Sequence, residues 1–177
     1  MESINPWETK GEINYSRLMK EFGISPMPEN LPKAFKEELL FRRGIVYGQR
    51  DFNRILEAIK NKKKFVMMTG LMPSGKFHFG HAMVVRQIIF YQNLGAKIYL
   101  AVADTEAYNT RNPNIKELEK IAVEEYLTNY IAMGLSPKNC DFYFQSKRSS
   151  DGKKSNKYYS LANAAARHIT FNEVKAI

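Results

Sequence analysis

The chain reads Thr69-Gly-Leu-Met-Pro-Ser-Gly-Lys-Phe-His-Phe-Gly-His81 between a short apolar run and a helical pattern. A glycine-rich turn from a buried strand into a helix places ligands beyond the carboxyl end of that strand. His78 and His81 are three residues apart, so they lie on one side of the first helical turn, beside free backbone N–H groups and the positive end of the helix dipole. Gly80 has no Cβ and leaves room for a flat ring such as ribose or adenine. The stretch predicts an anion site with two additional hydrogen-bond donors.

Two other interpretations of this stretch fit less well. A structural zinc cage uses four ligands, but beyond this pair the chain has one histidine, His168, and one cysteine, Cys140. The P-loop pattern requires Ser or Thr after Gly75-Lys76, where this chain has Phe77. Neither a zinc site nor ATP hydrolysis of the P-loop type is therefore expected.

Strands and helices alternate around the motif, which is typical of a parallel sheet with crossover helices. The predicted strands are 65–69, 97–103 and 141–145, and the predicted helices are 80–93, 115–133 and about 157 to the end. Three strand–helix units make about half of a doubly wound sheet. The predicted fold class is α/β, with a Rossmann-like parallel sheet that occupies residues 63–177.

Residues 1–62 differ from the sheet region and are predicted to form a mainly helical N-terminal extension. Proline recurs there, and helical patterns cover 15–22 and two segments between 36 and 64. Asp51 is the predicted N-cap of the later helix. Trp7 is interpreted as an anchor that holds the extension to the main body.

Composition is consistent with one modest globular domain. The 177 residues include 44% hydrophobic and 25% charged residues, which excludes a mainly disordered chain. The net charge of +9 indicates polyanionic partners such as nucleotides or RNA, or simply a soluble basic surface. No apolar run approaches the roughly 20 residues that cross a bilayer. The N-terminus has no signal-peptide pattern and no disulfide can form within the chain, so a cytoplasmic location is expected.

The residues after the first strand resemble a known signature. Pro73-Ser-Gly-Lys-Phe-His-Phe-Gly-His81 is similar to the "HIGH" signature of class I aminoacyl-tRNA synthetases. Ala103-Asp-Thr-Glu-Ala-Tyr108 resembles the tyrosyl and tryptophanyl enzymes of that class. Segments 5–15, 41–51 and 168–175 resemble the archaeal and eukaryotic tryptophanyl enzymes, whereas archaeal tyrosyl enzymes begin almost directly at the sheet.

This resemblance implies a tryptophan–tRNA ligase. Tryptophan and ATP would give tryptophanyl-adenylate and pyrophosphate, and the amino acid would then pass to the 3′ end of tRNA(Trp). Positioning and charge neutralisation at the phosphates would supply most of the catalysis. Mg²⁺ would screen the leaving pyrophosphate. A homodimer in the full-length protein is also implied.

The resemblance assigns site residues in this chain. His78 and His81 would be catalytic and donate hydrogen bonds to ATP, and Gly80 would lie near the adenosine. The preceding turn would complete the ATP site with Thr69, Gly70, Pro73 and Ser74. Lys76 is either a further phosphate contact or a solvated lysine.

The tryptophan site is assigned to Met68 and Glu106. Glu106 matches a family position where a carboxylate helps to bind tryptophan, and a buried acceptor for the indole N–H would reject phenylalanine; the alternative is a surface glutamate. Many relatives have an aromatic residue in place of Met68 and a glutamine in place of Ala101. Tyrosine therefore stays open as the competing amino acid.

Other hypotheses also remain. No "KMSKS" loop or anticodon-binding domain occurs before Ile177, so we expect a truncated chain that binds ATP weakly and activates tryptophan poorly or not at all. A related His-x-x-His nucleotidyltransferase, or a non-catalytic module that binds a partner chain or RNA, is the alternative class. The basic stretch 147–157 is either a tRNA contact or a solvated loop. His168 is expected to pack in the core or an interface.

Overall fold

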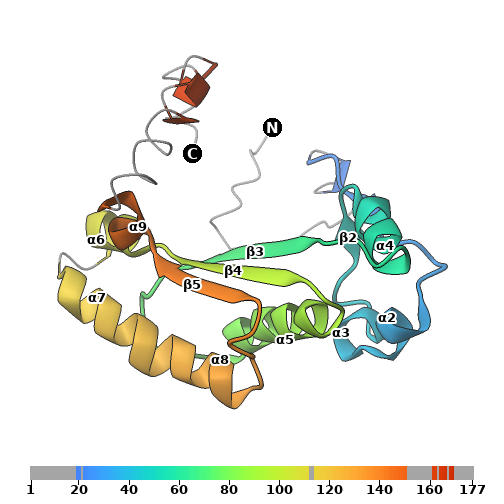
Figure 1. Cartoon of the computed structure of the whole chain (residues 1–177), viewed down its shortest axis with the longest axis horizontal. Coiled ribbons are helices and arrows are strands. Elements are labelled where there is room, and N and C mark those ends of the chain that lie inside the picture. Colours follow the sequence, from blue (N-terminus) through green and yellow to red (C-terminus); the bar gives the residue numbers. More distant parts are fainter. Residues whose placement is uncertain are drawn as a thin grey trace. The chain divides into compact units, whose positions relative to one another are not determined.

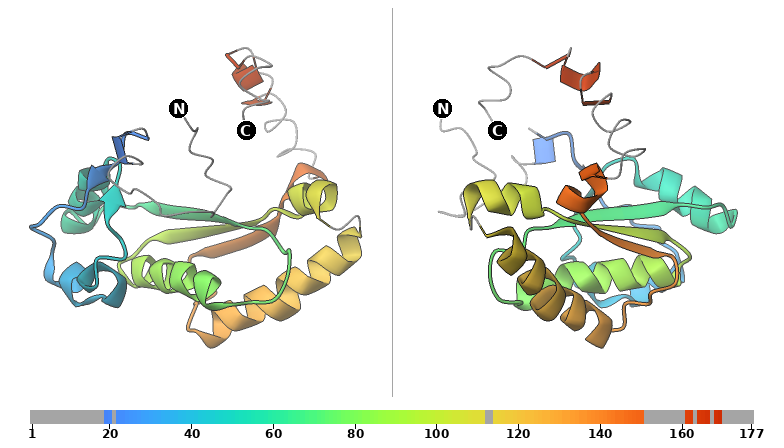
Figure 2. Two further views of the ribbon diagram at one scale, coloured as in Figure 1. Left: turned by 180° about the vertical axis from the view of Figure 1, so that it is seen from behind. Right: turned by 60° about the vertical axis from the view of Figure 1, so that its left-hand side comes forward.

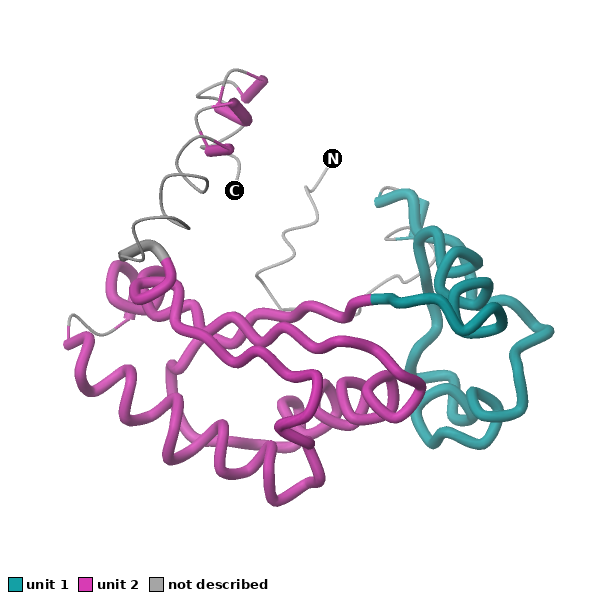
Figure 3. Tube along the Cα trace, in the orientation of Figure 1, with its two compact units in different colours: residues 1–65 teal, residues 66–177 magenta. Residues whose placement is uncertain are grey.

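The computed structural model describes residues 19, 20, 22–111, 114–150, 161, 162, 164–166, 168 and 169. The chain divides into two compact units, residues 1–65 and residues 66–177 (Figure 3). The first unit contains short helices and a two-stranded sheet. The second unit contains the parallel sheet and the motif that carries the two histidines.

The first unit is built around an aromatic cluster. Its elements are β1 (Ser25–Pro26), α2 (Lys33–Glu37), α3 (Leu39–Arg42), β2 (Gly48–Gln49) and α4 (Phe52–Lys60), and β1 pairs antiparallel with β2. Phe35 is fully buried and meets the rings of Phe41 and Phe52 edge-on, at centroid distances of 5.1 and 5.5 Å. These geometries are favourable for aromatic pairs, so three rings hold α2, α3 and α4 together.

Both helices predicted between residues 36 and 64 are present, as α3 and α4, but α2 was not predicted. Asp51 stands at the N-cap position of α4, yet its left-handed backbone (φ 55°) carries no side-chain cap. The prediction that Asp51 caps the helix is therefore wrong: Gln49 Oε1 accepts the N–H of Phe52 at 2.8 Å. Trp7 and most of the predicted helix 15–22 lie outside the described residues.

The second unit confirms the predicted α/β class, with a parallel sheet in the order β3-β4-β5. Its elements are β3 (Val66–Leu71), α5 (Phe79–Asn93), β4 (Lys97–Val102), α6 (Asp104–Thr110), α7 (Ile115–Ile121), the π-helix η1 (Ala122–Leu127), α8 (Thr128–Ala132), β5 (Cys140–Phe144) and α9 (Gln145–Ser150). All three predicted strands lie within two residues of the observed bounds.

The core of this unit lies between the sheet and the helices on one of its faces. Figures 1 and 2 show α5 and the continuous α7–η1–α8 helix on the same side of the sheet. The central strand β4 contributes Ile98, Leu100 and Val102, and α5 contributes Val85 and Ile88, all fully buried. The carboxyl ends of the strands meet at one edge, beside α6 and α9 (Figure 1).

Several details differ from the sequence predictions. The helix α6 was not predicted, and the predicted helix 115–133 contains a π-helical segment in its middle. Residues 147–150 of the predicted basic loop are helical, and Lys147 and Arg148 pair with Glu119 and Asp141 at 2.9 and 2.7 Å. These two cations are therefore engaged within the protein. Residues 151–157 lie outside the described part of the chain.

Near the C-terminus, His168 is exposed, as are the residues 161, 164 and 165 with which it was grouped. The prediction that it packs in the core of this chain is therefore wrong. A helical spacing of apolar residues does not by itself show which surface, if any, covers them.

Among the described residues, no helix has both the length and the apolar character needed to cross a membrane.

Leu100→Ala should destabilise the second unit by about 2–5 kcal/mol, because it removes a fully buried side chain from the central strand and leaves a cavity. Denaturant unfolding followed by circular dichroism measures the loss. Val66→Thr on β3 is the control, since Val66 is 54% exposed and the change keeps a β-branched residue. Equal stability of the two variants would contradict the placement of the core.

Candidate functional site

Two histidines, His78 and His81, cap the N-terminus of α5 in a reciprocal arrangement. His78 occupies the N-cap position in an extended conformation (φ −145°, ψ 176°). The N–H of Gly80 donates to Nδ1 of His78 at 3.1 Å, and the N–H of His78 donates to Nδ1 of His81 at 3.2 Å. The pair therefore satisfies two backbone donors at the helix start, in the reciprocal manner of a capping box.

This capping selects one tautomer for each ring. A neutral imidazole has one acceptor nitrogen and one donor nitrogen. Because Nδ1 accepts in both His78 and His81, the proton of each neutral ring is on Nε2. The two rings lie together, with centroids 3.8 Å apart and planes tilted by 31°. The site therefore presents a pair of Nε2–H donors at the positive end of a helix.

Aromatic rings surround His81. Phe77 stacks on it at a centroid distance of 5.6 Å, and the edge of Tyr126 meets it at 4.9 Å. Burial, with a smaller contribution from His78, lowers the pKa of His81 below its usual value. His81 is therefore neutral at pH 7, which is the form that can accept the N–H of His78.

Gly80 leaves room for the cap. A Cβ at this position would lie 3.0 Å from Cε1 and 3.1 Å from Nδ1 of His78. Such contacts are too close for the ring to keep its position. The sequence interpretation gave this glycine the role of admitting a ligand, and the structure adds that the absence of a Cβ leaves room for the ring of His78.

The turn before the helix combines one buried residue with exposed ones. Pro73 is fully buried, and Ser74, Gly75 and Lys76 are exposed. The N–H of Ser74 donates to the carbonyl of Met72 at 2.8 Å, which tightens the turn. At the end of β3, Thr69 is half-buried and Gly70 is exposed. The predicted ATP-site residues thus occupy one continuous segment from β3 to α5.

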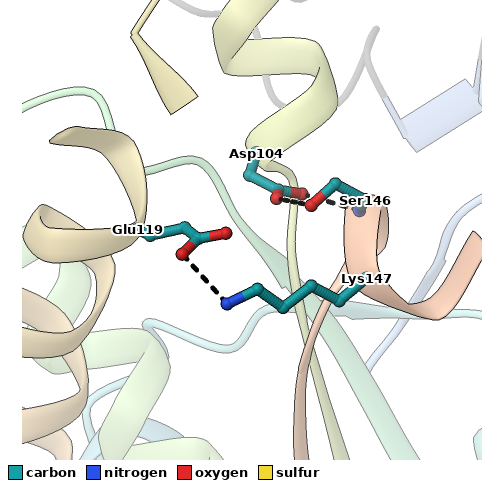
Figure 4. Close-up of polar contacts among 4 residues, drawn as sticks. All are labelled: Asp104, Glu119, Ser146 and Lys147. Atoms are coloured by element: carbon teal, nitrogen blue, oxygen red, sulfur yellow. Dashed lines mark hydrogen bonds and ion pairs between the residues drawn. The ribbon is translucent and has the colours of Figure 1, made fainter. Parts of the chain in front are cut away.

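A buried carboxylate joins the ends of β4 and β5. Asp104 is fully buried and accepts the N–H groups of Thr105 and Ser146, each at 3.1 Å, and the hydroxyl of Ser146 (Figure 4). Beside it, Lys147 Nζ lies 2.9 Å from Glu119 Oε2. Sequence reasoning did not single out Asp104, although an aspartate between an apolar strand and a helix was a usable signal.

The predicted tryptophan-site residues lie on other elements. Met68 is on β3 and 65% exposed, and Glu106 is on α6 with an exposed side chain. Ala101 is buried on β4, opposite Gly70 of β3. The structure thus brings His78, Gly80 and His81 into direct contact and leaves Met68 and Glu106 open to solvent. Among the described residues, no three metal-ligating side chains gather into a cluster.

Comparisons with known proteins identify similar sequences. A model of the family described as "tRNA synthetases class I (W and Y)" matches residues 60–176. The chain is 42% identical to the tryptophan–tRNA ligase of Methanocaldococcus jannaschii, over 98% of this chain and 45% of that protein. It is 43% identical to the corresponding enzyme of Aeropyrum pernix, over 99% of this chain and 47% of the relative. The chain spans less than half the length of these curated relatives.

Solved structures agree with the sequence comparisons. The crystal structure of the tryptophanyl-tRNA synthetase from Aeropyrum pernix superposes with a TM-score of 0.79 at 43% identity, covering 93% of this chain and 44% of that one. The tryptophanyl-tRNA synthetase from Encephalitozoon cuniculi bound to tryptophan has a TM-score of 0.75 at 22% identity, covering 92% of this chain and 45% of that one. At that identity the likeness shows the fold alone.

Gly80→Ala should displace the ring of His78 and break the cap, because the new Cβ would lie about 3 Å from two ring atoms. The usual stabilisation of about 0.5–1 kcal/mol for Gly→Ala in a helix should therefore be absent. Chemical shifts of the His78 ring nitrogens report the lost bond. Gly75→Ala is the control, since its Cβ would meet open space. Unchanged His78 shifts in Gly80→Ala would refute the capping role.

Proposed function

This chain belongs to the class I tRNA synthetases of the tryptophan and tyrosine group, and from that premise we propose that it takes part in the activation of tryptophan by ATP and its transfer to tRNA(Trp). In the first step a tryptophan carboxylate oxygen attacks the α-phosphorus of ATP, and pyrophosphate leaves. In the second, the tryptophanyl group passes to the 3′ end of the tRNA, and AMP leaves. The observation that carries the proposal is the pair of Nε2–H donors held at the start of α5.

In this proposal His78 and His81 are the catalytic residues. Their Nε2–H groups donate to phosphate oxygens of ATP, beside the positive end of α5. Donors that are already oriented lose little freedom when negative charge develops on the leaving pyrophosphate, so they stabilise the transition state efficiently. Gly80 lies near the adenosine, and Thr69, Gly70, Pro73 and Ser74 form the adjoining wall. Lys76 is exposed and free to approach the phosphates from the turn.

Mg²⁺ fits this arrangement as a companion of ATP. Magnesium commonly binds substrate phosphates with few protein ligands, and the described residues supply no dedicated cluster of ligands. When bound, it would neutralise charge on the leaving pyrophosphate. Each protein residue of the site would then contribute orientation and hydrogen bonds.

The tryptophan site is proposed at Met68 and Glu106. A carboxylate of Glu106 would accept the indole N–H, and Met68 would contact the apolar ring. Both side chains are exposed. Selectivity for the indole N–H requires a buried acceptor, so bound tryptophan would have to cover the Glu106 carboxylate. The named relatives, which are tryptophan–tRNA ligases, support tryptophan over tyrosine.

The wider organisation is also a proposal. Residues 1–62 form an N-terminal extension, and residues 63–177 form the HIGH-containing first part of a Rossmann-like catalytic domain. A family match that begins at residue 60 supports this boundary. We also propose that the protein acts in the cytoplasm and that the full-length protein assembles as a homodimer.

His78→Ala and His81→Ala should each weaken ATP binding by about tenfold or more, because a hydrogen bond to a charged group contributes about 1.5–3 kcal/mol. Isothermal titration calorimetry with ATP and Mg²⁺ measures the affinity. His168→Ala is the matched control, since His168 is an exposed histidine outside the site. Equal affinity in all three variants would count against the ATP site and favour a non-catalytic binding module.

Tryptophan should raise the melting temperature of the ATP-bound chain more than tyrosine does, and Glu106→Gln should reduce that difference. Differential scanning fluorimetry with each amino acid measures both effects. Glu117→Gln on α7 serves as the control, because Glu117 is also exposed. A larger shift with tyrosine would instead assign the chain to tyrosine activation.

A further inference from the structure

Tyr126 is a fully buried residue of η1 whose hydroxyl group makes no hydrogen bond of normal geometry within the described part of the chain. The hydroxyl lies beside Ser74 and Gly75, whose polar groups interact with it. Leaving a buried hydroxyl unsatisfied costs stability, and phenylalanine would fill the same space without that cost. Packing alone therefore does not explain why position 126 is tyrosine rather than phenylalanine.

Tyr126 lies on the buried face of a helix that contains a π-helical segment. Buried residues recur at every fourth position through this helix: Leu118, Ala122, Tyr126 and Tyr130. In a regular α-helix of 3.6 residues per turn, each step of four residues would rotate the side chain by about 40° away from the last. Ala122 and Tyr126 lie in η1, whose wider turn rotates less per residue and so reduces this drift between them. Such local π-segments often occur at functional sites.

Tyr126 contacts both parts of the candidate nucleotide site. The edge of its ring meets His81 at a centroid distance of 4.9 Å and Phe77 at 6.3 Å, with interplanar angles of 76° and 81°. Its hydroxyl interacts with the Ser74–Gly75 turn. Because Tyr126 is fully buried, it acts on a ligand only through these neighbours.

We propose that Tyr126 is a positioning residue for nucleotide binding: its ring holds His81 in the capping orientation, and its hydroxyl completes the hydrogen bonding of the Ser74–Gly75 turn when phosphates occupy the site. This inference rests on the proposed function for the identity of the ligand. Burial raises the pKa of Tyr126, so its hydroxyl stays protonated and available as a donor near neutral pH.

Two variants separate the ring from the hydroxyl. Tyr126→Phe should keep the melting temperature or raise it, keep the titration of His81, shift the amide signals of Ser74 and Gly75, and weaken ATP binding about fivefold to tenfold. Tyr126→Leu should in addition move the pKa of His81 upward, because the ring that helps to bury it is removed. Calorimetry with ATP and Mg²⁺, together with NMR of His81 and the two amides, provides the measurements.

Tyr130→Phe is the matched control. Tyr130 is buried one turn further along the helix and contacts Phe77 at 6.1 Å, and its change should leave ATP affinity and the Ser74 and Gly75 signals as they are. Wild-type affinity and unshifted amides in Tyr126→Phe would overturn the role of the hydroxyl, and an unchanged His81 titration in Tyr126→Leu would overturn the role of the ring. If the unaltered chain binds no ATP, the proposed function fails, while NMR of His81 in the ligand-free chain still decides whether the ring of Tyr126 holds His81 in place.

Discussion

The arrangement of the candidate site depends on the reciprocal cap between His78 and His81. A helix start leaves backbone N–H groups without partners, and most proteins satisfy them with a short polar side chain. Here two imidazoles accept through Nδ1, so each keeps its proton on the opposite edge of the ring. One interaction thus begins α5, fixes both tautomers and leaves little room for a Cβ at position 80. Aromatic packing around His81 favours the neutral form on which the cap depends.

Three helices, α5, α6 and α9, begin near the carboxyl edge of the sheet, and the caps of α5 and α9 differ in charge. The start of α9 is capped by the buried carboxylate of Asp104, which places a negative charge at the positive end of that helix. The start of α5 is capped by two imidazole nitrogens, so no carboxylate neutralises its positive end. This difference explains why the α5 end is the better candidate for an anionic ligand. The Asp104–Ser146 contact also joins the ends of two strands (Figure 4).

Much of the local structure was predictable from short-range patterns. The three strands, α5 and the two later helices of the first unit follow apolar periodicity and turn residues that act within a few positions. The juxtaposition of His78 and His81 follows from helical spacing for the same reason. Three details differ from the predictions: Gln49 rather than Asp51 caps α4, α6 follows β4 directly, and His168 does not lie in the core of this chain. These outcomes depend on backbone conformation and on packing, which the spacing of apolar residues does not give.

The sequence by itself determined the strand–helix alternation, the glycine-rich turn and the resemblance to class I synthetases, because these depend on residue types at fixed short spacings. Only the tertiary structure decided which residues from distant parts of the sequence meet. Asp104 meets Ser146 across 42 positions of sequence, and Tyr126 reaches His81 from a helix on a later crossover. The π-helical segment that contains Tyr126 could not be predicted, because the apolar pattern of residues 115–133 also fits an ordinary α-helix. Contacts of this kind depend on how elements pack, and packing is a property of the folded chain.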